Sequence, residues 1–127
     1  MKKVLTACMT MILVLTVALS AFAEQPYKEA IKKRVEEIVA AINSGKTAAD
    51  FKSAAREDPF VFIMKMDGAM LVHPTLAGKN MKDKPMYKVV SKADANGSWV
   101  TYEVFPGWSL TSYVKKTKDE LIVGCGM

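Results

Sequence analysis

The sequence predicts an α+β fold in which a five-stranded antiparallel sheet is backed by helices from the N-terminal part of the domain. Helical patterns come first, between residues 26 and 56. Two apolar runs joined by Asp67-Gly68 follow, and three more strand-like segments fill residues 98–126. Runs of antiparallel strands with helices on one side are typical of an α+β domain.

Residues 1–23 have the features of a Sec-type signal peptide and are left out of the fold prediction. Lys2 and Lys3 form a basic start, residues 4–19 are almost wholly apolar, and Ala21-Phe22-Ala23 is an A-x-A cleavage site. We therefore expect cleavage after Ala23 and a periplasmic or secreted domain of residues 24–127. The alternative is a retained membrane anchor, for which the apolar run is slightly short.

The chain has two cysteines, Cys8 and Cys125. Leu5-Thr6-Ala7-Cys8 matches a lipoprotein cleavage box by its letters, but it precedes the apolar core instead of following it, so lipidation at Cys8 is not expected. After cleavage only Cys125 remains, and the domain has no internal disulfide. An exposed Cys125 would pair between chains in an oxidising compartment. We favour the other interpretation, a buried Cys125 that acts as a small hydrophobe in the last strand.

The composition of the domain argues against one class of function. Removal of Lys2 and Lys3 lowers Lys+Arg from 18 to 16 against 13 Asp+Glu, which leaves a net charge of about +3. These charges are spread along a chain of one domain's length without a Lys/Arg block, so nucleic-acid binding is not supported. A slight positive field suits small anionic ligands.

Two helices are expected before the sheet. Apolar residues recur at helical spacing over residues 31–42, Pro26 can open this helix, and Asn43-Ser44-Gly45 ends it. Thr47 can cap a second, shorter helix that ends near Arg56, because its hydroxyl can accept a free backbone N–H.

The first two strands are expected at residues 60–66 and 69–73. The earlier run is apolar on both faces apart from Lys65, so it should be a central strand covered on both sides. Asp67-Gly68 between the runs favours a type I′ turn, which has positive φ at both central residues.

The rest of the chain completes the predicted sheet. Residues 74–84 form a loop, and residues 85–93 form a short helix that directs Met86, Val89 and Val90 inward. Aromatic and β-branched residues indicate strands at 98–104, 108–116 and 121–126. Turns are expected at Asn96-Gly97, at Phe105-Pro106-Gly107 and at Lys118-Asp119.

Four segments of this region carry a family resemblance. They are MDGAMLVHPTLAGKN at residues 66–80, GSWVTYEVFPG at 97–107, TSYVKK at 111–116 and LIVGCGM at 121–127. Together they resemble the single Cache domains, which are extracytoplasmic small-molecule sensor modules with a PAS-like fold. The resemblance covers most of residues 58–127 and implies a five-stranded antiparallel sheet backed by the N-terminal helix.

The sequence departs from the family pattern at two places. The acidic, glycine-containing loop that often follows Gly-Lys-Asn is cut short between Asn80 and Pro85. Leu110 stands where family members often have a lysine, three positions before the strand tyrosine. Both features border the family's ligand pocket, so the chemistry of the pocket is left open there.

His73 and Lys79 are candidate ligand-binding residues in and after the second strand. His73 is the single histidine. Its imidazole either faces a ligand, donating to a carboxylate or titrating near neutral pH, or is hydrogen-bonded to the nearby backbone. Lys79 either contacts an anionic ligand or is solvated.

Five further candidates lie on the strands. Trp99 is on the more polar face of its strand, whereas Tyr102 is on the face that looks like core. Tyr113, with Lys115 on the same face, can present its hydroxyl to a carboxylate, or it is a core tyrosine with a satisfied O–H. Phe62 and Met64 would meet the apolar part of a ligand, although methionines at this hairpin also suit a core.

The sequence gives little support for catalysis or for a cofactor. A single histidine with one distant cysteine does not make a metal site. No Ser/His/Asp set, no Gly-rich phosphate loop before a helix and no catalytic carboxylate pair stands out. We therefore do not expect an enzyme.

Two hypotheses about function remain. The first is a secreted or periplasmic Cache-like domain that binds a small organic anion such as a short carboxylate. Because the sequence ends just after the last strand, such a domain would act through a membrane-bound sensor partner, or as a scavenging or presenting protein. The alternative is a structural or protein-interaction domain that keeps the fold, has lost the ligand pocket, and forms a homodimer or docks through its N-terminal helix.

Overall fold

The computed structural model describes residues 25–126, so the expected signal peptide and its cleavage site lie outside the described residues. The chain divides into residues 1–30 and 31–127, and the second unit carries the whole sheet. Within residues 25–126, no helix has both the length and the apolar character needed to cross a membrane.

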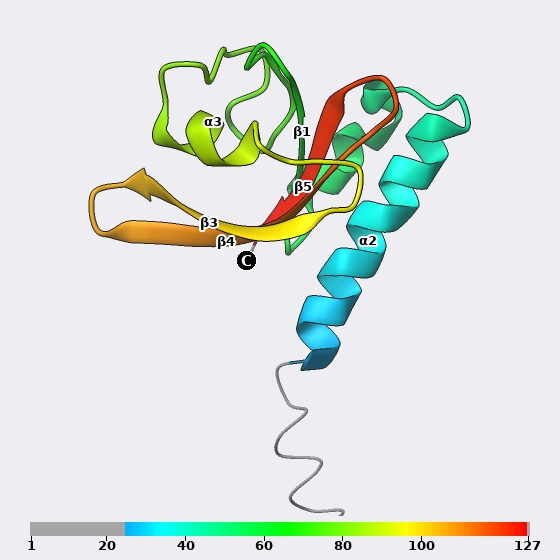
Figure 1. Cartoon of the computed structure of the whole chain (residues 1–127), viewed down its shortest axis with the longest axis horizontal. Coiled ribbons are helices and arrows are strands. Elements are labelled where there is room, and N and C mark those ends of the chain that lie inside the picture. Colours follow the sequence, from blue (N-terminus) through cyan, green and yellow to red (C-terminus); the bar gives the residue numbers. More distant parts are fainter. Residues whose placement is uncertain (1–24, 127) are drawn as a thin grey trace, which may run out of the picture. The chain divides into compact units, whose positions relative to one another are not determined.

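Three helical segments and five strands make up the described chain (Figure 1). The helical segments are α2 (Gln25–Asn43), the 3₁₀ helix η1 (Ala48–Arg56) and α3 (Pro85–Val90). The strands are β1 (Val61–Lys65), β2 (Met70–Val72), β3 (Ser98–Phe105), β4 (Trp108–Lys116) and β5 (Leu121–Gly126).

All five strands form one antiparallel sheet in the order β2-β1-β5-β4-β3. Strand β1 pairs with β2 on one side and with β5 on the other, and its first four residues are buried. The prediction of an α+β fold with a five-stranded antiparallel sheet is confirmed, as is a first strand covered on both faces.

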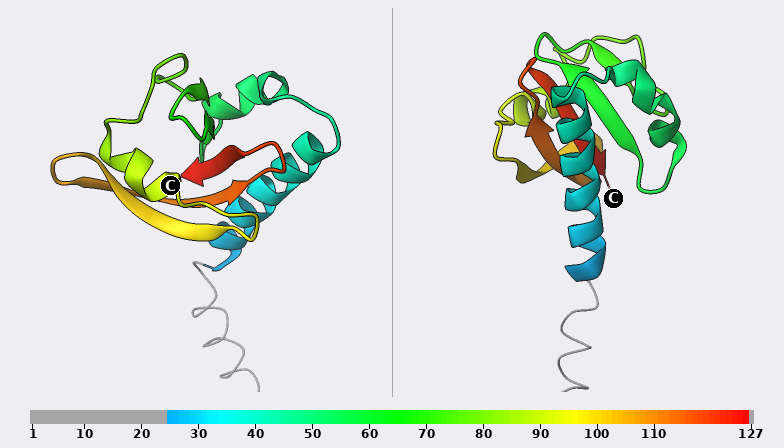
Figure 2. Two further views of the ribbon diagram at one scale, coloured as in Figure 1. Left: turned by 45° about the horizontal axis from the view of Figure 1, so that its top comes forward. Right: turned by 90° about the vertical axis from the view of Figure 1, so that its right-hand side faces the viewer.

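Each face of the sheet is covered by its own hydrophobic cluster. One face packs against α2, from Ile31 onward, and against η1. The other face packs against α3 and the loop that precedes it (Figures 1 and 2). The alternation along β1 separates the clusters, since Val61 and Ile63 belong to the first and Phe62 and Met64 to the second.

The helix ends follow the expected signals. Helix α2 ends at Asn43, and Thr47 is the N-cap of η1. The cap is carried by the Asp50 carboxylate, which accepts hydrogen bonds from the Thr47 backbone N–H at 2.9 Å and the Thr47 hydroxyl at 3.2 Å. These bonds lower the pKa of Asp50, because they favour its charged form.

The turn between β1 and β2 differs from the predicted type I′. Gly68 has a φ of 94°, but Asp67 does not have a positive φ. The Gly68 N–H donates to the Lys65 carbonyl at 3.0 Å, and the Lys65 N–H donates to the Ala69 carbonyl at 2.9 Å. This is the three-residue hairpin loop, in which a turn is followed by one left-handed glycine. The predicted position of the hairpin is confirmed, but the predicted type I′ turn is wrong.

The β3–β4 hairpin extends beyond the rest of the sheet. Strand β4 pairs with β5 only from Ser112 to Lys116, whereas its pairing with β3 begins at Trp108. The outer half of the hairpin is therefore a two-stranded ribbon (Figure 1). Strand alternation places Val104 and Leu110 of this ribbon on the face covered by α3.

Gly124 on β5 makes room for a buried aromatic ring. It is the register partner of Phe62, and a Cβ atom added at Gly124 would overlap the Phe62 ring. Phe62 is fully buried. The absence of a side chain at Gly124 thus lets the Phe62 ring approach the β5 backbone closely.

Candidate functional site

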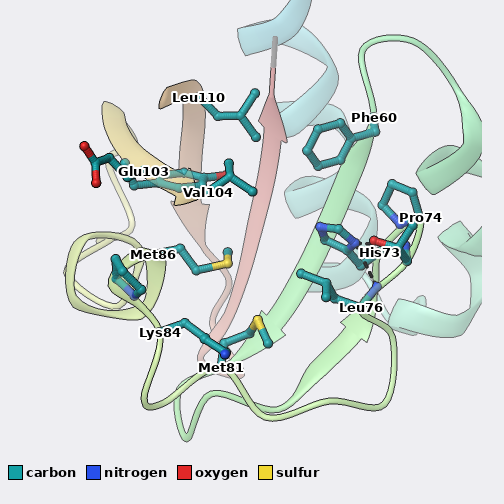
Figure 3. A pocket seen from close by; sticks show the side chains of 13 residues that line it. Phe60, His73, Pro74, Leu76, Met81, Lys84, Met86, Glu103, Val104 and Leu110 are labelled. Atoms are coloured by element: carbon teal, nitrogen blue, oxygen red, sulfur yellow. Dashed lines mark hydrogen bonds between the residues drawn. The ribbon is translucent and has the colours of Figure 1, made fainter. Parts of the chain in front are cut away.

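A cavity of about 410 Å³ lies on the sheet face covered by α3 (Figure 3). One wall is the end of β2 with the loop that follows it, and the opposite wall is the β3–β4 ribbon. The segment leading into α3 closes the cavity at one end, and Phe60 contributes from the start of β1. The lining residues are Phe60, His73, Pro74, Thr75, Leu76, Met81, Lys84, Pro85, Met86, Tyr102, Glu103, Val104 and Leu110.

His73 is held in the cavity wall by the backbone of its own loop. Its Nδ1 atom accepts hydrogen bonds from the backbone N–H groups of Thr75 and Leu76, each at 3.0 Å. The imidazole also packs edge-on against Phe60, with ring centroids 5.4 Å apart. The other ring nitrogen, Nε2, points toward the cavity (Figure 3). The expected hydrogen bonding to the nearby backbone is thus made by Nδ1, and a contact of Nε2 with a ligand stays a prediction.

These hydrogen bonds determine the protonation state of His73. An Nδ1 that accepts two N–H groups has its lone pair engaged, so we assign the proton of the neutral ring to Nε2. Burial lowers the pKa of His73 below its usual value, which also favours the neutral ring. The Nε2–H group of His73 is thus a hydrogen-bond donor held in a fixed position in the cavity wall.

Of the other polar side chains that line the cavity, Tyr102 is engaged in a hydrogen bond and Glu103 is turned outward. The Tyr102 hydroxyl and Ser112 Oγ share a buried hydrogen bond of 3.1 Å. Burial raises the pKa of Tyr102, so its hydroxyl stays protonated. Glu103 is exposed, and its carboxylate points away from the cavity in Figure 3. Lys84 is also exposed and adds a positive charge at the rim.

The loop that carries Met81 into the cavity is attached to the β1–β2 hairpin. The Met70 N–H donates to the Lys79 carbonyl at 2.9 Å, and the Met81 N–H donates to the Gly68 carbonyl at 2.7 Å. The Asn80 side chain adds two bonds, as Nδ2 donates to the Asp67 carbonyl at 3.3 Å and Oδ1 accepts from the Lys82 N–H at 2.9 Å. Gly-Lys-Asn thus acts as a structural element of the cavity wall.

The structure brings together three of the seven predicted site residues. His73 lines the cavity, and Phe62 and Met64 lie on the same face of the sheet. Both are fully buried in the cluster that also contains Met81 and Met86, so they form the layer behind the cavity instead of its surface.

Three other predicted residues lie on the opposite face of the sheet. Tyr113 packs in the cluster of α2, and its hydroxyl donates to the Asn96 carbonyl at 3.4 Å. Trp99 packs edge-on against Tyr113, with ring centroids 5.4 Å apart. Lys115 Nζ lies 4.0 Å from the Glu36 carboxylate of α2. The sheet thus separates these three residues from His73.

Lys79 belongs to neither hydrophobic cluster of the sheet. It is exposed, does not line the cavity, and contributes its backbone carbonyl to the attachment of the loop. Lys84 is the lysine that lies at the cavity.

Most of the cavity wall was not among the predicted site residues. The loop between His73 and Pro85 has no periodicity, so its side chains could not be assigned to a face. One signal was available there: Leu76 and Met81 are isolated apolar residues in a polar loop. Leu110 and the shortened loop after Asn80, noted as departures from the family pattern, do border the cavity.

The donor set does not suit a metal ion. In the described part of the chain, no three His, Cys, Asp or Glu residues are grouped to hold one. His73 Nε2 carries the proton in the assigned tautomer, so this nitrogen has no lone pair for a metal.

Comparison with known proteins shows similarity in fold. No protein-family model matches the sequence, and no curated protein matches it significantly. The structure is similar to that of a methyl-accepting chemotaxis protein from Vibrio parahaemolyticus, with a TM-score of 0.52 and 15% sequence identity. The match covers 89% of this chain and 95% of that chain. At this identity the likeness shows a shared fold.

Proposed function

We propose that the chain is an extracytoplasmic, PAS-like sensory domain of the Cache type that binds a small organic anion in the cavity beside His73. The main support is the His73 imidazole itself, whose Nδ1 is held by the loop while Nε2–H faces an apolar cavity. A cavity of about 410 Å³ is within the usual range of small-molecule sites, roughly 300–1,000 Å³.

The proposed ligand has a polar end and an apolar body, and each is held by a different part of the cavity wall. A carboxylate can accept the Nε2–H of His73 and be attracted by the Lys84 ammonium at the rim. The apolar part would lie against residues such as Leu76 and Met86. Lys84 thus takes the role that sequence analysis gave to Lys79, Tyr113 and Lys115, because it lies on the same side of the sheet as His73.

The site favours binding without catalysis. The lining has one histidine whose Nδ1 is already engaged, and its single carboxylate, on Glu103, is directed away from the cavity. A general acid–base pair would need two groups within reach of one substrate atom. Such a domain would transmit ligand binding through a membrane-bound sensor partner. The fold shared with a chemotaxis protein supports this role.

A thermal-shift screen of carboxylates, amino acids, amines and purines tests the proposal. A ligand present at about 100 times its dissociation constant stabilises the folded state by about 2.7 kcal/mol, which raises the melting temperature by several degrees. We expect a carboxylate hit whose shift is lost in His73→Asn and kept in Lys79→Gln, a matched control outside the cavity. If no compound shifts the midpoint, the domain is not a small-molecule binder of this kind.

The β3–β4 ribbon favours a second candidate function, a protein-interaction domain. Trp108 and Val104 keep 67% and 49% of their surface exposed near the tip of the hairpin. Exposed apolar side chains grouped in this way are typical of contact surfaces. Gel filtration with light scattering would show a concentration-dependent dimer that Trp108→Ser abolishes. If the protein is a monomer at all concentrations, self-association through this surface is ruled out.

A further inference from the structure

We infer that the ligand of this cavity is a monocarboxylate with a compact apolar body, aromatic or branched aliphatic, and that the cavity discriminates against amines, amino acids and dicarboxylates. This inference rests on the proposed function and specifies the ligand of the same site. It depends on how donors, acceptors and apolar groups are distributed along the cavity wall.

The cavity offers one oriented hydrogen-bond donor. His73 Nε2–H is fixed, because Nδ1 accepts the backbone N–H groups of Thr75 and Leu76. The Tyr102 hydroxyl is shared with Ser112 Oγ in a buried hydrogen bond. The fixed Nε2–H thus suits an acceptor group on the ligand, while Thr75 and Lys84 are exposed lining residues and Lys84 adds charge attraction at the rim.

A ligand ammonium would find no anion in this wall. The only carboxylate among the lining residues is that of Glu103, which is exposed and points away from the cavity (Figure 3). An amine or the α-ammonium of an amino acid would therefore lose its hydration without gaining a charged partner, which costs free energy. The nearby Lys84 ammonium adds like-charge repulsion.

The rest of the wall is apolar and sets the nature of the ligand body. Leu76, Met81, Met86, Val104 and Leu110 surround the space beside Phe60. Methionine thioethers are flexible and polarizable and make favourable contacts with aromatic rings, so Met81 and Met86 suit a planar body. A second carboxylate placed among these apolar side chains, away from Lys84 at the rim, would lose its hydration with no donor to receive it.

Calorimetry with four related compounds tests this ligand class. 3-Phenylpropanoate is the reference, phenylsuccinate adds a carboxylate, phenylalanine adds an ammonium, and 3-phenylpropylamine replaces the carboxylate by an ammonium. We expect 3-phenylpropanoate to bind the purified protein at least tenfold more tightly than the other three. Because a hydrogen bond to a charged group is lost, His73→Asn should weaken this binding about tenfold or more, whereas Lys79→Gln should not.

A second variant does not depend on His73. Leu110 is only partly buried on the ribbon, so Leu110→Asp should fold, and its carboxylate would repel the ligand anion and disrupt the apolar wall. We expect it to weaken 3-phenylpropanoate binding about tenfold. Unchanged affinity in both Leu110→Asp and His73→Asn would overturn the inference.

The outcomes separate the ligand class from the site. Tighter binding of phenylsuccinate, phenylalanine or the amine, lost in His73→Asn, would overturn the ligand class and leave the binding function in place. If none of the four compounds binds, the ligand class is wrong. If the broad thermal-shift screen is negative as well, the proposed function is wrong too.

Discussion

The Nδ1 atom of His73 accepts the backbone N–H of Leu76 at 3.0 Å, so one side chain at the end of β2 organises the loop that forms the cavity wall. The same bond leaves Nε2–H as the donor that faces the cavity. The structural role and the binding role of His73 thus belong to different nitrogens of one ring, and they can be separated by substitution.

Two substitutions should separate these roles. In His73→Asn, the amide oxygen can replace Nδ1 as acceptor for the loop, but no group reaches the position of Nε2. In His73→Gln, the amide can reach that position, but the N–H groups of Thr75 and Leu76 lose their acceptor. We expect His73→Asn to keep most of its stability and lose ligand affinity. His73→Gln should keep part of the affinity and lose about 1 kcal/mol of stability. Urea denaturation and calorimetry measure the two effects, and equal stability losses in both variants would contradict this assignment.

The stability of the folded protein should decrease as the pH is lowered through the titration of His73. Burial lowers the pKa of His73 in the folded state below its unfolded value of 6.5. The unfolded state therefore binds the proton first as pH falls, and the stabilising contribution present above pH 6.5 is lost below it. The stability of the wild type relative to His73→Asn should fall as the pH is lowered from 7.5 to 5, measured by urea denaturation. A difference that is constant over this range would show that the folded pKa is not lowered. The comparison also cancels contributions from groups that the two proteins share.

Gly124→Ala tests the close approach of Phe62 to β5. A Cβ atom at Gly124 would overlap the Phe62 ring, whereas one at Gly126 would meet Phe60 at 3.2 Å and Ser112 Oγ at 3.0 Å. Because the overlap at Gly124 is deeper and Phe62 is fully buried, Gly124→Ala should lose about 1–3 kcal/mol of stability. Gly126→Ala is the matched control on the same strand face and should lose less.

Rescue of Gly124→Ala distinguishes steric overlap from other causes. Phe62→Leu removes the ring that the new methyl group would overlap. This substitution should therefore lower the stability of the Gly124→Ala variant less than it lowers that of the wild type. Chemical denaturation of the four proteins in this double-mutant cycle gives the coupling. Additive losses would contradict a direct contact.

The Cys125 thiol should be unreactive in the folded protein. Burial in β5 raises its pKa to about 11, so at pH 8 the thiolate fraction is on the order of a thousandth. Its Sγ lies 3.8 Å from the Pro59 carbonyl. We expect iodoacetamide to label Cys125 only after denaturation, as followed by peptide mass spectrometry. Rapid labelling under native conditions, or a disulfide-linked dimer in non-reducing electrophoresis, would show that the thiol is accessible.

The sequence predicted the sheet well because each strand carries its own signal. The apolar alternation of β1 and the Asp67-Gly68 turn depend on neighbouring residues alone, so they placed the first hairpin without knowledge of the rest of the fold. The turn type was wrong, since Asp67 and Gly68 occur in more than one hairpin geometry.

The candidate site was harder to predict because it depends on which faces of different strands coincide. Alternation shows that Tyr113 and Val114 lie on opposite faces of β4, but it does not show which of them shares a face with Phe62. The register does so: Phe62 pairs with Gly124, and Gly124 pairs with Val114. Val114 therefore belongs to the cavity face, and Tyr113 belongs to the face of α2.

The nitrogen chemical shifts of His73 test the central claim most directly. The chain has one histidine, so its imidazole gives a single pair of ¹⁵N signals without ambiguity. We predict that Nδ1 is unprotonated and Nε2 protonated at pH 7.5, and that saturation with 3-phenylpropanoate shifts the Nε2–H proton while Nδ1 stays unprotonated. A proton on Nδ1, or an Nε2–H signal that does not respond to any bound ligand, would contradict the account.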